Sequence, residues 1–241
     1  MSPHEAPSQR RQWYPEQPQR PRRYLLANKP YDVLSEFHDP EGRPTLAGFV
    51  SVPGLEPAGR LDQDSEGLLV LTDDGDLAHQ LTHPDYHLPK TYLVQVEGVP
   101  QAGALQKLRQ GVSVKGETTD AAEVELLERV PDLPPRDRPV RDDIETSWLR
   151  MIIREGKKRQ IRHMTAAVGH PTLRLVRVAI GPITLRGLAP GEWRDMEDSE
   201  LARLRRILRD VQAQQPAPRK SQPAARPFRA FRGIGRGKSG R

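Results

Sequence analysis

Short apolar runs alternate with polar, turn-forming stretches through the middle of this chain. Alternating or continuous apolar positions predict β-strands, and apolar residues three or four positions apart predict amphipathic helices. The expected strands cover residues 24–28, closed by Lys29-Pro30, and residues 68–72, 92–96, 123–129, 148–153 and 172–180. The expected helices cover residues 77–81, 101–110 and 157–168, with a last helix marked by Leu201, Leu204, Leu208 and Val211.

Residues that favour turns and helix ends set the limits of these elements. Asp76 is expected to cap the helix 77–81, which must stop before Pro84 because proline cannot continue a helix. Gly111 and Gly169 are expected to end two further helices. Passage 30–59 is rich in glycine and proline and predicts a loop or a short helix, and the proline-rich passage 131–143 predicts a linking loop. Strands and helices do not alternate strictly, so the pattern predicts an α+β domain and argues against a doubly wound fold.

Composition narrows the class of protein. The 241 residues suffice for a stable core, and the absence of cysteine excludes disulfides, a thiolate nucleophile and a cysteine zinc site. No apolar run approaches the roughly 18 residues of a membrane span. The first 23 residues are polar and proline-rich, unlike a secretory signal. We therefore expect a cytoplasmic protein.

The net charge of +6 is unevenly distributed. Residues 1–23 and 215–241 carry about +3 and +8, which leaves about −5 for the middle of the chain. Both ends have too few apolar residues to offset chain entropy, so residues 1–23 and 214–241 are expected to be disordered, around a folded domain at 24–213. Phe228 and Phe231 stand among arginines in the basic tail, a composition typical of weakly specific RNA binding. Residues 154–177 form a second basic segment, which predicts either an RNA-binding face or simply a solvated charged one.

A cluster of charged residues, Arg60, Asp62, Asp64 and Glu66, precedes the apolar run 68–71. Carboxylates and an arginine at the edge of a sheet predict a reactive pocket. A calcium loop is a weaker alternative, because Asp73 stands where that loop needs a long bidentate glutamate. A metal site at His79, His83 and His87 is also weak, since Pro84 interrupts their helix.

Three separated motifs resemble the signature of the RsuA-type family of ribosomal RNA pseudouridine synthases. They are Gly-Arg-Leu-Asp-x-Asp-Ser-Glu-Gly-Leu-Leu at 59–69, Lys-Thr-Tyr at 90–92 and Glu-Gly-Lys-Lys-Arg-Gln-Ile-Arg-His-Met at 155–164. Residues 28–34, 172–175 and 191–194 are most similar to the RluE-like subgroup, which acts on the large ribosomal subunit. The resemblance covers about residues 24–198. It implies a pseudouridine synthase fold, with a curved, mixed, mostly antiparallel sheet flanked by helices around a central RNA-binding cleft formed by two subdomains.

The same resemblance implies isomerisation of uridine to pseudouridine in ribosomal RNA, most directly the 23S RNA, with no metal or coenzyme. Asp62 would be the essential carboxylate, acting either as nucleophile at ribose C1′ or by stabilising the opened sugar. Arg162 would face Asp62 and keep it ionised. Tyr92 would stack on the target base, and its hydroxyl is a candidate for proton removal.

The resemblance also implies contacts with RNA. Arg60 would hold the extruded nucleotide or fill its place, although an ion pair with Asp64 or Glu66 is an equal alternative. Ile153 would pack on the other side of the base. The further RNA-binding candidates are Lys29, Lys90, Lys157, Lys158, Arg159 and Gln160. No S4 domain is expected before residue 24, and a monomer is the family-like state. A non-catalytic RNA-binding or ribosome-assembly factor is the competing hypothesis.

Overall fold

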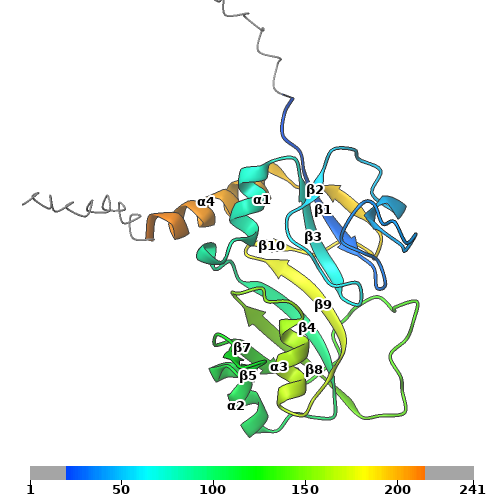
Figure 1. Cartoon of the computed structure of the whole chain (residues 1–241), viewed down its shortest axis with the longest axis vertical. Helices are drawn as coiled ribbons and strands as arrows, with labels where there is room; N and C mark the ends of the chain where they lie inside the picture. Colours follow the sequence, from blue (N-terminus) through cyan, green and yellow to red (C-terminus); the bar gives the residue numbers. More distant parts are fainter. Residues whose placement is uncertain (1–19, 215–241) are drawn as a thin grey trace, which may run out of the picture.

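The computed structural model describes residues 20–214 and consists of a long curved sheet with helices packed against it (Figure 1). The sheet strands are β1 (Tyr24–Lys29), β2 (Glu56–Pro57), β3 (Glu66–Thr72), β4 (Lys90–Glu97), β7 (Glu123–Leu126), β8 (Thr146–Ile153), β9 (Thr172–Ile180), β10 (Ile183–Thr184) and β11 (Trp193–Asp195). A separate hairpin joins β5 (Ser113–Val114) and β6 (Glu117–Thr118). The helices are η1 (Leu46–Gly48), α1 (Gly75–Thr82), η2 (Pro84–Tyr86), α2 (Ala102–Gln110), α3 (Gln160–Ala167) and α4 (Asp198–Gln214).

Strand β9 lies at the centre of the sheet, whose order is β11-β1-β3-β9-β4-β8-β7. Among the described strands, β3 and β9 form the one parallel pair, with Glu66 opposite Val176 and Gly67 opposite Arg177. All other pairs are antiparallel. The parallel pair joins the part of the sheet near the chain ends to the part built on β4, β7 and β8 (Figure 1). The expected mixed, mostly antiparallel sheet is therefore confirmed.

Burial explains the patterns of the individual strands. Every residue of β3 is buried, because helices or loops cover both faces, and this strand reads as a continuous apolar run. Strand β4 instead alternates between buried and half-buried positions. One core cluster extends along one face of the sheet and includes Leu69, Val94 and Met151. A second cluster, including Val70 and Leu204, lies beneath α1 and α4.

Two expected helix starts are wrong. Asp74, not Asp76, caps α1, because its carboxylate accepts a hydrogen bond from the backbone N–H of Leu77 at 3.1 Å. Helix α3 begins at Gln160 instead of residue 157. Arg159 has a left-handed backbone with φ of 55°, which ends the preceding turn and sets the helix start.

The other long elements agree with the expectation to within a few residues, and β9 matches it at both ends. The two- and three-residue strands β2, β5, β6, β10 and β11 were not expected, because pairing partners define them more than periodicity does. None of the helices between residues 20 and 214 combines the length and apolar character needed to cross a membrane.

Candidate active site

A cavity of about 680 Å³ opens where the loop before β3 meets β4, β8, β9 and the start of α3. This volume is in the range of pockets that hold a nucleotide-sized ligand. Most of the expected site residues contribute to its wall. They are Arg60, Asp62, Lys90, Tyr92, Ile153, Lys157, Lys158, Arg159 and Gln160. The three sequence motifs thus converge on one cavity.

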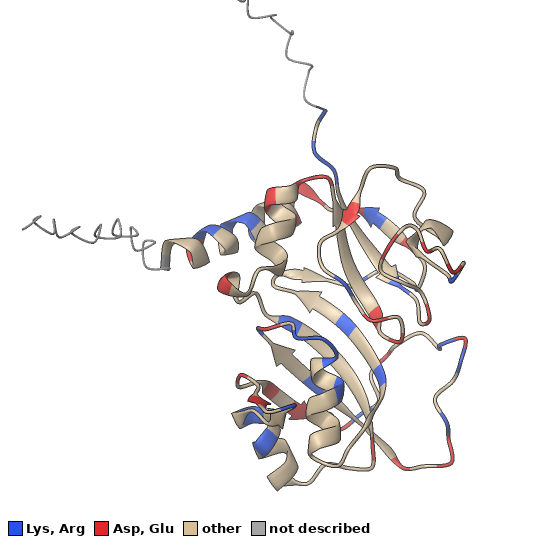
Figure 2. Ribbon diagram, viewed as in Figure 1, with Lys and Arg blue, Asp and Glu red and all other residues tan. Residues whose placement is uncertain are grey.

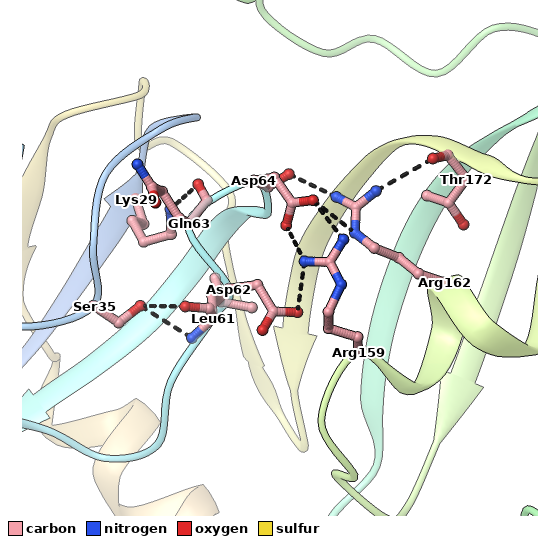
Figure 3. Close-up of polar contacts among 9 residues, drawn as sticks. All are labelled: Lys29, Ser35, Leu61, Asp62, Gln63, Asp64, Arg159, Arg162 and Thr172. Carbon is pink, nitrogen blue, oxygen red and sulfur yellow. Dashed lines mark hydrogen bonds and ion pairs between the residues drawn. The ribbon is translucent and has the colours of Figure 1, made fainter. Parts of the chain in front are cut away.

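The loop that carries Asp62 is held from behind by buried polar groups (Figure 3). The Ser35 hydroxyl accepts a hydrogen bond from the Leu61 N–H at 3.0 Å and donates to the Leu61 carbonyl at 2.8 Å. The Lys29 ammonium donates to the carbonyls of Pro30 at 2.8 Å, Val33 at 2.6 Å and Gln63 at 3.2 Å. These contacts fix the backbone on both sides of Asp62, which limits the motion of its carboxylate.

Lys29 is therefore a structural residue and not the RNA contact that we expected. Its side chain is fully buried, and carbonyls take all three of its N–H donors. Burial lowers the pKa of Lys29 to about 8, against the nearby charges of Glu66 and Asp64, which raise it.

Gly67 brings the same loop close to β9. Its φ is +106°, and a Cβ at this position would lie 2.3 Å from the Arg177 carbonyl oxygen. Only glycine fits this conformation and this contact without strain. The close approach places Asp62 beside the β9 strand and the cavity that it lines.

The arginine nearest to Asp62 is Arg159, whose Nη1 lies 4.0 Å from Asp62 Oδ2. The expected partner, Arg162, instead turns to Asp64: its Nη2 donates to the Asp64 carbonyl at 2.6 Å, and its Nε lies 3.4 Å from Asp64 Oδ2 (Figure 3). Its Nη1 donates to the Thr172 carbonyl at 3.2 Å. The expected direct pairing of Arg162 with Asp62 is wrong in this structure, because the loop turns the next acidic residue toward the arginine.

Asp64 is consequently the most strongly paired acid of the loop. Arg159 donates from Nη1 and Nη2 to its two carboxylate oxygens at 3.0 and 2.8 Å. Burial raises the pKa of Asp64, but the hydrogen bonds from Arg159 and the charges of Arg162 and Arg159 outweigh it and hold that pKa below its usual value. Burial lowers the pKa of Arg162, and the hydrogen bond to Asp64 raises that of Arg159.

Tyr92 and Ile153 lie on the sheet floor of the cavity. Both side chains are buried, with 7% and 5% of their surface exposed, and both line the cavity. Lys90, two residues before Tyr92 and opposite Ile153 in the β4–β8 pair, projects from the same face. This floor offers an aromatic ring and an aliphatic side chain to a planar base.

The remaining expected RNA contacts divide into exposed and internal side chains. Arg60 has 70% of its side chain exposed and lies 3.9 Å from Glu36 Oε2, not beside Asp64 or Glu66. Lys157 and Lys158 are exposed, and Lys157 Nζ lies 3.2 Å from Glu117 Oε2. Gln160 is buried: it accepts from the Lys157 N–H at 3.1 Å and donates to Glu155, so its amide shapes the turn before α3. It also lines the cavity, and its contact with RNA stays a prediction.

Lysines and arginines gather along β9 and around the start of α3, with more on α4 (Figure 2). Two of those on β9 are buried and were not assigned to the site from the sequence. Arg174 forms a paired contact with Glu66, at 3.0 and 2.8 Å, which locks β9 to β3. Arg177 lines the cavity. One feature of the sequence indicates their roles: both arginines stand at positions that the apolar pattern of the strand predicts to be buried.

Neither metal alternative finds support in the described residues. Glu66 begins β3 and accepts two hydrogen bonds from Arg174, so the calcium-loop geometry is absent. Within residues 20–214, no group of three or more His, Asp or Glu side chains is arranged to hold a metal ion.

Comparison with known proteins gives consistent results. Residues 23–167 match the RNA pseudouridylate synthase family. A "Ribosomal large subunit pseudouridine synthase E" of Xanthomonas axonopodis pv. citri is 58% identical over 170 residues, which cover 69% of this chain and 90% of that protein. The Vibrio parahaemolyticus protein of the same name is 51% identical over 178 residues, 73% of this chain and 74% of that protein.

Among solved structures, a pseudouridylate synthase crystal structure matches with a TM-score of 0.65 and 31% identity, over 76% of this chain and 74% of that one. The family match spans the loop with Asp62, strand β4 and helix α3. On these sequence and structural grounds, the chain belongs to the RNA pseudouridylate synthase family.

Proposed function

We propose that this protein converts uridine to pseudouridine in large-subunit ribosomal RNA. The observation that carries the proposal is the position of Asp62, held on a rigid loop at the wall of a nucleotide-sized cavity that Tyr92 also lines. The relatives named large-subunit pseudouridine synthase E support the large-subunit RNA as the substrate.

The reaction exchanges one bond to the ribose for another. The bond between C1′ and uracil N1 breaks, and its electron pair stays on the base. The base then turns, C5 forms a bond to C1′, the C5 proton leaves and N1 is protonated. Asp62 meets the positive character at C1′, either as a nucleophile or as a stabilising anion. Arg159 Nη1 lies 4.0 Å from Asp62 Oδ2 and places a positive charge beside this carboxylate.

The floor of the cavity binds the base. Tyr92 stacks on one face of the uracil, and Ile153 packs against the other. A base inside an RNA helix cannot reach this cavity, so the target nucleotide must leave its stack. The exposed side chains of Arg60, Lys157 and Lys158 surround the cavity and supply phosphate contacts for that step.

Arg162 acts on the reaction through Asp64 instead of through a direct contact with Asp62. It contacts both the backbone carbonyl and the side-chain carboxylate of Asp64, which lies two residues after Asp62. We assign to Arg159 and Arg162 together the role of fixing the loop before β3 through Asp64 and balancing its negative charge. Arg159 therefore contributes to the active site more than to RNA binding.

The domain organisation is part of the same proposal. Residues 24–213 form the catalytic domain, with its cavity between two subdomains, and the protein acts as a monomer in the cytoplasm. The expected disordered segments and their RNA contacts fall mainly on residues 1–19 and 215–241, which lie outside the described residues. For them the proposal rests on composition, chiefly the eight basic residues after position 214.

The experiment maps pseudouridine in 23S and 16S RNA transcripts after incubation with the wild-type protein and with Asp62→Asn. We expect one or a few uridines of the 23S transcript to be converted by the wild type alone. A wild type that binds the 23S transcript but leaves no pseudouridine in it would favour the non-catalytic RNA-binding or assembly factor instead.

A further inference from the structure

Arg177 on β9 is a buried cation in the wall of the cavity. Only 4% of its surface is exposed. Its Nε donates to the Leu68 carbonyl at 2.8 Å, which fixes the guanidinium at the junction of β3 and β9. The backbone below it is held by the close contact with Gly67. The side chain is therefore positioned on a rigid part of the sheet.

The terminal nitrogens of this guanidinium have no hydrogen-bond acceptor within residues 20–214; Nη2 is closed off from solvent and Nη1 is not, so Nη1 is the nitrogen that a ligand in the cavity can reach. This differs from Arg174, three residues earlier, which binds Glu66 through two hydrogen bonds. A buried charge without a partner is unfavourable by itself. Its position in the wall of an open cavity indicates that the missing acceptor comes from a ligand.

The neighbours of Arg177 reinforce this point. Tyr92 is its partner across the β4–β9 pair, so the two side chains project from the same face of the sheet. Lys90 lines the same cavity, and burial and the charge of Arg177 lower its pKa. Two cations and a tyrosine thus face the cavity, and within residues 20–214 no acid lies within ion-pair distance of either cation.

We propose that Arg177 donates a hydrogen bond to a carbonyl oxygen of the target uracil and stabilises the negative charge that the base acquires when its bond to ribose breaks. This inference rests on the proposed function and adds a residue that acts on the leaving base, opposite in role to Asp62.

Because Arg177 is buried in the wall of the cavity, we take its partner to be the base and not the phosphate. In an extruded nucleotide the base is the end that enters the cavity, while the phosphates remain part of the RNA backbone at the entrance. When the N1–C1′ bond breaks, the electron pair spreads from N1 onto the carbonyl oxygens. A fixed donor beside that oxygen interacts more strongly with the transition state than with the neutral base, and it therefore raises the rate more than the affinity.

The test uses the full chain and a 23S transcript labelled with tritium at uridine C5, because pseudouridine formation releases that hydrogen. Release is followed in a single turnover with saturating enzyme, and RNA affinity and the thermal midpoint are measured in parallel. The variants are Arg177→Met, which keeps the bulk but removes the charge, and Arg177→Lys, which keeps the charge. Arg150→Met, at an exposed arginine on β8, is the control.

We expect Arg177→Met to release tritium about 100-fold more slowly or slower still. Its RNA affinity should stay within about threefold of the wild type, and its thermal midpoint should change little, because removal of a buried charge without a counter-ion offsets loss of the hydrogen bond to the Leu68 carbonyl. Arg177→Lys should have an intermediate rate, and Arg150→Met should match the wild type.

Three results would overturn the inference alone. An unchanged rate for Arg177→Met would show that the guanidinium is not used. A normal rate at saturation with weaker affinity and a salt slope reduced by about 1 would assign Arg177 to a phosphate. A variant that does not fold, or whose midpoint falls while each folded molecule keeps its rate, would show a structural role. If the wild type itself releases no tritium, the proposed function fails, and the inference fails with it.

Discussion

The two carboxylate oxygens of Asp64 accept hydrogen bonds from the two terminal nitrogens of Arg159, at 3.0 and 2.8 Å. This paired contact joins the loop before β3 to the turn before α3, segments 95 residues apart in the chain. It also brings Arg159 to within 4.0 Å of Asp62. Asp64 therefore positions the cation that faces the proposed catalytic carboxylate, and it is more than a loop-forming residue.

Replacing Asp64 with asparagine should destabilise the protein by about 1–3 kcal/mol, because Arg159 and Arg162 lose their charged acceptor. The rate of pseudouridine formation should fall but remain measurable, since Asp62 is intact. Urea unfolding and a single-turnover assay measure the two effects. An Asp64→Asn variant with wild-type stability would contradict the positioning role.

The effect of Asp64 on stability should depend on pH. Its pKa in the folded protein is lowered, whereas an unfolded aspartate has a pKa of about 3.9. The stabilisation is then complete above roughly pH 4 and is lost as the pH falls through the folded pKa. Unfolding free energies of wild type and Asp64→Asn should differ most at pH 7 and converge below about pH 4. A constant difference down to pH 3 would argue against this linkage.

Lys29→Met should lower stability by about 1–3 kcal/mol, because three buried carbonyls lose their donor. RNA affinity per folded molecule should not change. The matched control is Lys158→Met at an exposed lysine beside the cavity, for which we expect the reverse: unchanged stability, weaker RNA binding and a smaller salt slope. Filter binding at several salt concentrations and thermal unfolding distinguish the two. Weaker RNA binding by folded Lys29→Met would restore its expected RNA contact.

Gly67→Ala should be among the most damaging single-methyl changes in the sheet. The positive φ alone costs on the order of 1–3 kcal/mol, and the new Cβ would meet the Arg177 carbonyl 2.3 Å away. Gly103→Ala, in α2 with open space around it, should instead stabilise by roughly 0.5–1 kcal/mol. Chemical denaturation of both variants provides the comparison. Equal effects would show that β3 and β9 are not packed as closely as described.

The strands could be predicted well where their burial produces a recognisable pattern of apolar residues in the sequence. The first residues of β9 alternate in sequence and residues 68–71 of β3 are continuously apolar, so both strands were found with nearly correct ends, although the structure buries four consecutive residues of β9, 174–177. The motifs also identified which segments share a cavity. The short strands have no such pattern. The cap of α1 could not be predicted because it depends on which of two nearby aspartates, Asp74 or Asp76, turns toward the helix.

The pairings inside the site could not be predicted, because they depend on backbone detail. The left-handed conformation of Arg159 turns its side chain toward Asp64 and Asp62, whereas Arg162, one turn into α3, reaches only Asp64. Lys29 looked like an RNA contact because its charge is visible in the sequence. The three carbonyls that surround it come from residues whose positions only the folded loop defines.

In the proposed reaction, Asp62 carries out the chemistry while Asp64, two residues later, positions the arginines. The most direct measurement compares Asp62→Asn and Asp64→Asn in one single-turnover assay of pseudouridine formation on the 23S transcript, with folding of both variants verified. We expect no detectable product from Asp62→Asn and a slower but measurable reaction from Asp64→Asn. Product from Asp62→Asn, with none from Asp64→Asn, would contradict this expectation and assign the chemistry to the carboxylate that Arg159 binds.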